Sequence, residues 1–298
     1  MNIPKSILKE KRLLLERLVD NLSKVPHVAA VVLGGSYASG IQRSTSDLDI
    51  GLYYFEAEPF SIDEIKSVAN DISRPGSLPT VTGFYEWGAW VNGGAWIHTP
   101  QGKVDFLYRN LDQIQRTIAE AQQGISHHDY DQQPTYGFYS VIYLAETQIC
   151  IPLYDPEMLI AKLKHRVGTY PPKLKQKIIT DSLWAAEFTL LHARSFAAQG
   201  DIYNTVGCLT RVVSNMTQAL FALNERYFIR DKKVLDTVAK FPNLPSDYIQ
   251  GINRILACPG RTVQELTKTV SGLEQAWFNV VSLTGVHYEP KFQIGKLR

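Results

Sequence analysis

Three small residues and two carboxylates form the part of the sequence whose residue types could do chemistry on a phosphate. Gly34, Gly35 and Ser36 stand together, and Asp47 and Asp49 follow about a dozen residues later. Glycines have no Cβ, so a phosphate can approach the backbone N–H groups closely, and the serine adds a hydroxyl. Paired carboxylates supply the hard oxygen ligands that suit Mg²⁺. The spacing therefore predicts a site for a nucleoside triphosphate and its metal ion.

Two predicted strands position these residues. Residues 29–33 are a short apolar run that stops at the glycines, as a buried strand does before a sharp turn. Residues 46–53 alternate with period two, which places Asp47 and Asp49 side by side on one face of a strand. Like charges this close are destabilising unless something neutralises them, and a metal ion is the simplest neutraliser. The alternative is an ordinary turn followed by two aspartates that face solvent.

A third carboxylate lies in a later apolar run. Residues 103–108 predict a strand with Asp105 on one face and three apolar side chains on the other: Val104, Phe106 and Tyr108. An aspartate alone in such a strand is a candidate for a metal ligand or a proton acceptor. The alternative is an edge-strand aspartate that pairs with a cation such as Lys103.

The sequence Gly35-Ser36 followed by Asp47-Leu48-Asp49-Ile50 resembles the signature of the nucleotidyltransferase superfamily shared with DNA polymerase beta. Its small-molecule branch, with the kanamycin and streptomycin nucleotidyltransferases, is the branch we find most similar. The resemblance implies an α+β fold, in which a mixed sheet with flanking helices is followed by an all-helical C-terminal domain. It also implies transfer of a nucleoside monophosphate to a hydroxyl of a small-molecule acceptor, with release of pyrophosphate.

The same resemblance implies roles for individual residues. Two Mg²⁺ ions would be held by three carboxylates, namely Asp47, Asp49 and Asp105. ATP or another nucleoside triphosphate would bind through Gly34, Gly35, Ser36 and Ser46. Two other phosphate motifs are excluded, because no Lys-Ser/Thr follows Gly40 and the glycine spacing is not that of a dinucleotide fold.

Length and composition favour two domains. The chain has 298 residues, of which 45% are hydrophobic and 20% charged, and the net charge of +2 argues against a protein that follows a long nucleic acid. We place a catalytic domain at 1–130 and a helical, substrate-binding domain at 131–298. Residues 124–134 are polar and are interpreted as a linker, and the chain beyond them is expected to be all-helical, with helices over residues 136–149, 156–167, 173–199, 203–227 and 263–283.

The helical region supplies two further candidates. Glu187 shares a predicted apolar face with Trp184 and Leu191, so it could be a general base that faces the acceptor, or the structural partner of Arg194. Lys232 lies in a run of basic residues, and the resemblance implies that such residues can reach the triphosphate. A solvated charge run is the alternative for Lys232.

Tryptophans gather just before the third carboxylate. Residues 84–91 and 95–98 predict two strands joined by a turn at Asn92-Gly93-Gly94. Trp87, Trp90 and Trp96 could stack on an adenine, but large aromatic residues in strands more often belong to the core.

Two other functions stay open from the sequence. One is nucleotidylation of a protein, and the other is a non-catalytic nucleotide-binding module, which the presence of three carboxylates disfavours. The N-terminus lacks the apolar core of a signal peptide, no run of about 20 apolar residues predicts a membrane helix, and the three cysteines have no paired spacing. We therefore expect a cytoplasmic protein without a membrane partner, and a homodimer stays open.

Overall fold

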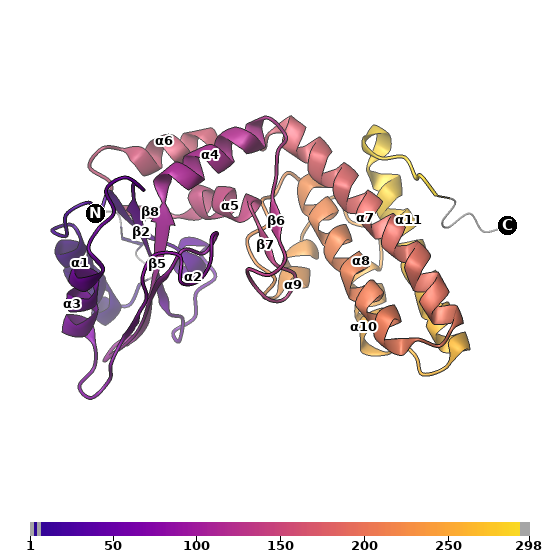
Figure 1. The fold of residues 1–298 in the computed structure, drawn as a ribbon, viewed down its shortest axis with the longest axis horizontal. Coiled ribbons are helices and arrows are strands. Elements are labelled where there is room, and N and C mark those ends of the chain that lie inside the picture. Colours follow the sequence, from indigo (N-terminus) through magenta and orange to yellow (C-terminus); the bar gives the residue numbers. More distant parts are fainter. Residues whose placement is uncertain (1–2, 5–6, 293–298) are drawn as a thin grey trace. The chain divides into compact units, whose positions relative to one another are not determined.

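The computed structural model describes residues 3–4 and 7–292, and the chain divides into two compact units (Figure 1). The first unit is Met1–Glu120 with His127–Thr169, and the second is Ala121–Ser126 with Tyr170–Arg298. This division differs from the predicted boundary at residue 130. The reason is that β8 (Ile151–Tyr154) pairs with β1 (Ala30–Leu33), so that the chain returns to the sheet after the polar segment. The expectation that everything after this segment is helical is wrong at β8.

The first unit is built on a six-stranded mixed sheet in the order β3-β4-β5-β2-β1-β8. Strands β2 and β5 are parallel, and the other neighbouring pairs are antiparallel. The remaining strands of the sheet are β2 (Leu48–Tyr54), β3 (Thr80–Val81), β4 (Gly94–Thr99) and β5 (Gly102–Asn110). The predicted mixed sheet with flanking helices is confirmed.

One face of the sheet forms the core of this unit. Leu48, Ile50 and Leu52 of β2 are buried, and they belong to the same apolar cluster as the buried residues of α1 (Lys9–Leu22) and α3 (Ile62–Ile72). These two helices cover this face (Figure 1). The period-two alternation of β2 thus sends its leucines and isoleucine into the core and Asp49 to the opposite face.

The opposite face is covered only in part. Helix α5 (Val141–Ile149) lies over one end of it, where Glu146 binds the buried Arg109 of β5 with two hydrogen bonds of 2.8 and 2.9 Å. Helix α2 (Gly35–Ala38) follows β1 and contacts β2 at the other end. The first unit also contains helix α6 (Leu159–Arg166) and nearly all of α4 (Leu111–Gln122). The carboxylates described below lie on the part of this face that α5 leaves open.

Residues 84–91 do not form the predicted strand. They form a series of turns, in which Tyr85, Gly88 and Asn92 have positive φ values that a strand does not allow. The buried Asn92 holds these turns through side-chain hydrogen bonds to Ala89 and Gln113. The polar segment also differs from the prediction, because its strand β6 (His128–Asp129) pairs with β7 (Phe138–Tyr139), which lies at the start of the predicted helix over 136–149.

The second unit is helical, as predicted. Its helices are α7 (Pro172–Ala198), α8 (Ile202–Leu223), α9 (Val234–Val238), α10 (Tyr248–Ala257) and α11 (Val263–Leu283), followed by a 3₁₀ turn at Gly285–His287. Trp277 of α11 is fully buried and its indole N–H donates to the Leu183 carbonyl of α7 at 3.3 Å. Helix α11 has the predicted bounds, and a capping box of Thr262 and Glu265 fixes its start. In the part of the chain that the structure describes, no helix is long and apolar enough to cross a membrane.

Glu187 is fully buried in the second unit, where it holds the segment that follows α11. Its carboxylate accepts hydrogen bonds from the Tyr288 hydroxyl and from the backbone N–H groups of Lys291 and Phe292, at 2.9 and 2.6 Å for the two backbone donors. The predicted pair of Glu187 with Arg194 is wrong, because Arg194 binds Glu274 instead.

The prediction that Glu187 shares an apolar helical face with Trp184 is also wrong. Trp184 and Phe188 are exposed and stack on each other, whereas Glu187 shares the buried face of α7 with Leu183 and Leu190. Leu183 lies four residues before Glu187 and Leu190 three residues after it, so the three side chains face the core of the second unit together.

Glu187→Gln should destabilise the second unit by about 1–3 kcal/mol, because an amide N–H₂ replaces an oxygen that accepts from buried donors. Urea unfolding measures the loss, and hydrogen exchange at residues 288–292 should speed up. Asp181→Asn is the matched control on the same helix, since Asp181 forms only an exposed pair with Lys177 and should change stability by less than about 1 kcal/mol. Equal stability of Glu187→Gln and wild type would contradict this role.

Candidate functional site

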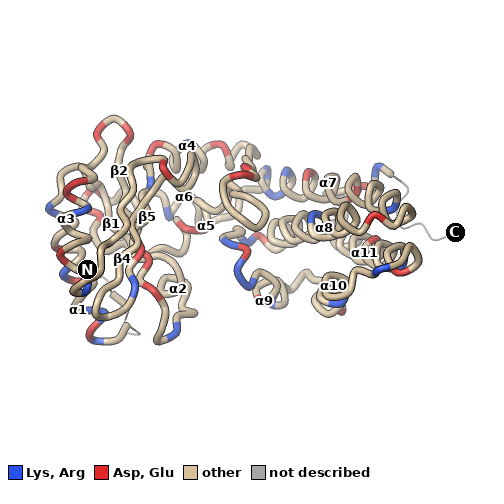
Figure 2. Tube along the Cα trace, turned by 60° about the horizontal axis from the view of Figure 1, so that its bottom comes forward, with Lys and Arg blue, Asp and Glu red and all other residues tan. Residues whose placement is uncertain are grey.

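Part of the predicted site lies in one row across the sheet. The Gly34 N–H donates to the Asp49 carbonyl at 2.8 Å, Asp49 on β2 lies opposite Asp105 on β5, and Asp105 lies opposite Trp96 on β4. Residues in register on neighbouring strands, which run about 4.8 Å apart, project to the same face. Acidic positions accordingly lie between β4, β5 and α2 (Figure 2). The row therefore brings the glycine turn and two of the three carboxylates together.

Gly35 is fixed as glycine by the Asp49 carboxylate. Its φ is +56°, and a Cβ at this position would lie 1.7 Å from Asp49 Oδ2 and 2.5 Å from Asp49 Cγ. A side chain at 35 would also occupy a left-handed backbone conformation, which costs roughly 1–2 kcal/mol for residues other than glycine. The turn and the carboxylate are thus packed against each other, and only a residue without a side chain allows it.

Asp105 is a carboxylate whose pKa is raised by its surroundings. Partial burial and the negative charge of Asp47 raise the pKa of Asp105, while Lys103 and His98 act in the opposite direction. Lys103 and His98 are neighbours of Asp105 on the same face, opposite each other in the β4–β5 register. A carboxyl with a raised pKa binds a proton more readily than usual, which is the property that a proton acceptor at neutral pH needs.

The three carboxylates fit a divalent cation by their chemistry. All are hard oxygen donors, and the effect of Asp47 on Asp105 marks a concentration of negative charge that a cation would relieve. Within residues 3–4 and 7–292 no three His, Cys, Asp or Glu side chains are grouped closely enough to hold a metal ion as they stand. The backbone register nevertheless brings Asp49 and Asp105 together, and Asp47 lies two residues before Asp49 in the loop that leads into β2.

The other predicted phosphate ligands differ in their surroundings. Ser36 lies in the first turn of α2 and is half-buried. Ser46 supports the loop before Asp47, since its hydroxyl accepts from the Arg43 N–H at 2.8 Å. Lys232 is exposed in a turn before α9 in the second unit. Contact of any of these side chains with a triphosphate stays a prediction.

Lys11 is a buried cation that the sequence analysis did not identify. Its ammonium donates to the Ser46 carbonyl at 2.5 Å, the Ser44 carbonyl at 3.3 Å and the Tyr37 hydroxyl at 3.2 Å. These acceptors belong to α2 and to the loop that leads into Asp47, so Lys11 joins α1 to both parts of the site. The signal was present: Lys11 lies four residues after Ile7 and three before Leu14, on the apolar stripe of α1.

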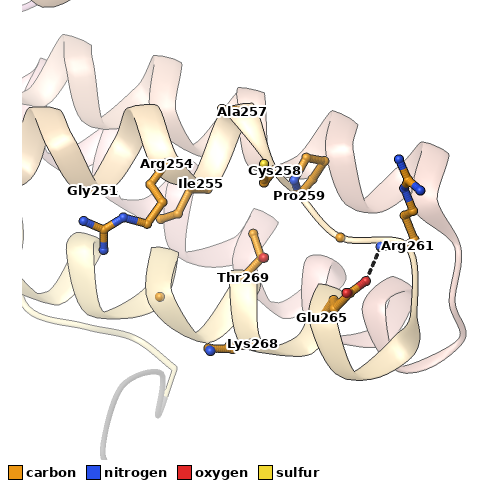
Figure 3. Close-up of a pocket in the computed structure, with 12 residues that line it drawn as sticks. Gly251, Arg254, Ile255, Ala257, Cys258, Pro259, Arg261, Glu265, Lys268 and Thr269 are labelled. Atoms are coloured by element: carbon orange, nitrogen blue, oxygen red, sulfur yellow. Dashed lines mark hydrogen bonds between the residues drawn. The ribbon is translucent and has the colours of Figure 1, made fainter.

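A large hollow lies elsewhere, between α10 and α11 of the second unit (Figure 3). Its volume is about 900 Å³, and none of the predicted site residues line it. Gly251 and Gly272 leave room between the two helices, and Glu265 on its wall is already bound by the backbone N–H groups of Arg261 and Thr262. The hollow therefore follows from missing side chains rather than from converging polar groups.

A family model for the nucleotidyltransferase domain matches residues 12–75, which include the glycine turn, Asp47 and Asp49. The chain carries a nucleotidyltransferase domain. The prediction of a nucleotidyltransferase is confirmed by this match, and the class of its donor substrate is a nucleoside triphosphate. The match does not extend to Asp105 or to the second unit.

Solved structures of two other proteins are similar to the chain that carries this nucleotidyltransferase domain. One is a nucleotidyltransferase-like protein from Exiguobacterium sibiricum, with 9% identity, 93% of this chain and 78% of that chain covered, and a TM-score of 0.47. The other is an aminoglycoside 6-adenyltransferase from Bacillus subtilis, with 11% sequence identity and a TM-score of 0.35. The alignment covers 95% of this chain and 94% of that chain. No curated protein matches the chain.

Gly35→Ala should lower the rate of nucleotidyl transfer by about 10²-fold, because the new Cβ pushes the Asp49 carboxylate out of place. Steady-state pyrophosphate release and thermal unfolding measure the two effects. Gly40→Ala is the matched control, since Gly40 has a φ of +70° and no atom lies within 4 Å of the point that its Cβ would occupy. Gly35→Ala should lose more stability than Gly40→Ala, because its Cβ meets the Asp49 carboxylate as well as straining the backbone, and only Gly35→Ala should lose activity. A Gly35→Ala enzyme as active as Gly40→Ala would contradict the packing argument.

Asp105→Asn should stabilise the metal-free protein at neutral pH. The raised pKa of Asp105 means that the folded state favours the protonated form, so its stabilising contribution is present at low pH and is lost as the pH rises through the raised pKa. The asparagine carries no charge to lose, and its advantage should shrink as the pH falls toward about 4, near the ordinary pKa of an aspartate. Urea unfolding across this acidic range and up to neutral pH measures the trend.

Asp47→Asn serves as the comparison for that titration. It removes the charge that raises the pKa of Asp105, so it should flatten part of the same pH dependence. An Asp105→Asn protein less stable than wild type at neutral pH would contradict the sign of the effect.

Proposed function

We propose that this nucleotidyltransferase moves a nucleoside monophosphate, AMP from ATP in the first instance, onto a hydroxyl of a small molecule in the cytoplasm. The observation that carries the proposal is the row in which Asp49 faces Asp105 across β2 and β5 while Gly35 packs against Asp49. This arrangement puts the glycine turn and the first turn of α2 beside carboxylates on an uncovered part of the sheet. A triphosphate and a metal ion need these two features next to each other.

The proposed reaction is an in-line displacement at the α-phosphorus. The acceptor hydroxyl oxygen forms a bond to the α-phosphorus, and the bond from that phosphorus to the bridging oxygen breaks, so pyrophosphate leaves with the electron pair. The hydroxyl proton passes to the Asp105 carboxylate, which lies opposite Asp49 in the β2–β5 register. Gly34, Gly35 and Ser36 hold and orient the phosphates, and most of the rate comes from this positioning.

Three carboxylates would hold the metal ions, namely Asp47, Asp49 and Asp105. Two bound Mg²⁺ ions would neutralise charge on the phosphates and lower the pKa of the acceptor hydroxyl. Lys11 fixes the loop before Asp47 through two hydrogen bonds, to the Ser44 and Ser46 carbonyls, so the first of these ligands is held at its backbone before any ion arrives.

Asp105 is preferred over Glu187 as the proton acceptor. Both oxygens of Glu187 are occupied by donors from the segment after α11, and the side chain is fully buried. A base must reach the proton that it removes. The second unit is proposed to bind the acceptor, with an aminoglycoside-like molecule as the first class to test, because the sequence resembles the small-molecule branch of the superfamily.

Asp47→Asn and Asp49→Asn should each reduce transfer by about a thousandfold or more, because each removes a charged oxygen from the phosphate and metal site. Stability should hold or rise, since like charges are separated. The assay is pyrophosphate release from Mg-ATP with a panel of hydroxyl acceptors, accompanied by thermal unfolding. Asp63→Asn, an exposed change on α3 at the opposite face of the sheet, is the control and should keep wild-type turnover. Near-wild-type release by either site variant would rule out this assignment.

A further inference from the structure

Trp96 is a large aromatic side chain that remains accessible beside the carboxylates. It lies on β4 directly opposite Asp105, and its exposed fraction is 53%. Its strand neighbours Ala95 and Ile97 are buried in the core on the other face. Trp96 therefore does not belong to the core, although aromatic residues in strands usually do.

A second tryptophan supports Trp96 from one side. The rings of Trp87 and Trp96 are stacked, with centroids 4.8 Å apart and an interplanar angle of 24°. A ring with one face covered and the other open is about half exposed, as Trp96 is. The pair thus presents one free, flat apolar surface next to Asp105.

The position of Trp87 is fixed by its surroundings within the first unit. Gly94 makes room for it, since a Cβ at Gly94 would lie 2.8 Å from Trp87 Cζ3. The Trp87 carbonyl accepts from the Gln132 side chain at 2.7 Å, and the same amide accepts from the Trp90 N–H at 2.8 Å. The hairpin loop that contains Gln132 therefore holds the turns that carry Trp87, and the stacked pair is a built surface.

The order of residues across the sheet indicates whether Trp96 lies on the phosphate side or on the acceptor side of Asp105. The glycine turn lies next to Asp49 on the β1 side, Asp105 follows on β5, and Trp96 lies beyond it on β4. If the phosphates occupy the glycine turn, Trp96 is separated from them by Asp105. Asp105 is the residue proposed to take the acceptor proton, so the open face of Trp96 lies on the acceptor side.

We propose that Trp96, backed by Trp87, is the stacking platform for the acceptor, and that the acceptor is a ring-bearing polyhydroxyl compound of the sugar or cyclitol type. The apolar C–H face of such a ring covers the indole while a hydroxyl at its edge points to Asp105. This inference rests on the proposed function, because it takes the reacting hydroxyl to lie beside Asp105.

The charges around the platform suit a polar ring rather than a hydrocarbon. Asp47 and Asp105 are acidic, and Lys103 and His98 supply hydrogen-bond donors on the same face. Hydroxyl groups can pair with both kinds of side chain, whereas an apolar ligand would leave them without partners.

Equilibrium binding separates this inference from the proposed reaction. The probes are ring alcohols, both amino sugars such as kanamycin and neutral methyl glycosides, titrated by calorimetry with a non-hydrolysable ATP analogue and Mg²⁺ present. Trp96→Ala should weaken binding of a ring alcohol about tenfold, Trp96→Phe should restore most of the affinity, and the dissociation constant of the ATP analogue should change less than about twofold. Tyr130→Ala is the control, since Tyr130 is also an exposed aromatic residue of the first unit, where it contacts His128 edge-on, and this change should leave the affinity for ring alcohols as in wild type.

Three results would overturn the platform: equal affinity of wild type and Trp96→Ala for the ring alcohols, weakened binding of the ATP analogue instead, or no binding of any ring alcohol to wild type. The second result would assign Trp96 to the nucleobase. If ring alcohols bind in a Trp96-dependent manner but no pyrophosphate is released, the platform stands and the proposed reaction fails.

Discussion

The close contact between the Gly35 backbone and the Asp49 carboxylate is the constraint on which the site depends. It fixes the turn after β1 against the middle of the row that crosses β2, β5 and β4. Because the distance leaves no space for a Cβ, the turn cannot move toward the carboxylate or carry a side chain there. The rest of the row, from the glycine turn to Asp105, is placed relative to this contact.

The rest of the first unit supports that contact from both faces of the sheet. Apolar residues of β2 pack into the core under α1 and α3, so the strand cannot rotate to move Asp49. Lys11 reaches from α1 to the loop before Asp47 and to Tyr37 of α2. A buried ammonium needs acceptors for its protons, and this need ties three separate segments together.

The sequence allowed a good prediction of the parts that repeat a simple pattern. The alternation in β2 and the isolated Asp105 were sufficient to place two strands, although β2 begins at Leu48 and leaves Asp47 in the preceding loop. The helix predicted over 263–283 has the bounds of α11. The turns at 84–91 were missed because the buried Asn92 and positive φ values, rather than strand propensity, decide their course. Glu187 was misread because its partners come from a segment about a hundred residues away, which no local spacing reveals.

The chain returns to the sheet as β8, and this return limits where a fragment of the protein can end. Strand β8 covers the outer side of β1, whose four residues are all buried. A fragment that ended near residue 130 would leave the hydrogen-bonding groups of β1 open along an apolar edge, and such an edge recruits strands from other molecules. A monomeric fragment that holds the sheet of the first unit must therefore extend past residue 130 to include β8.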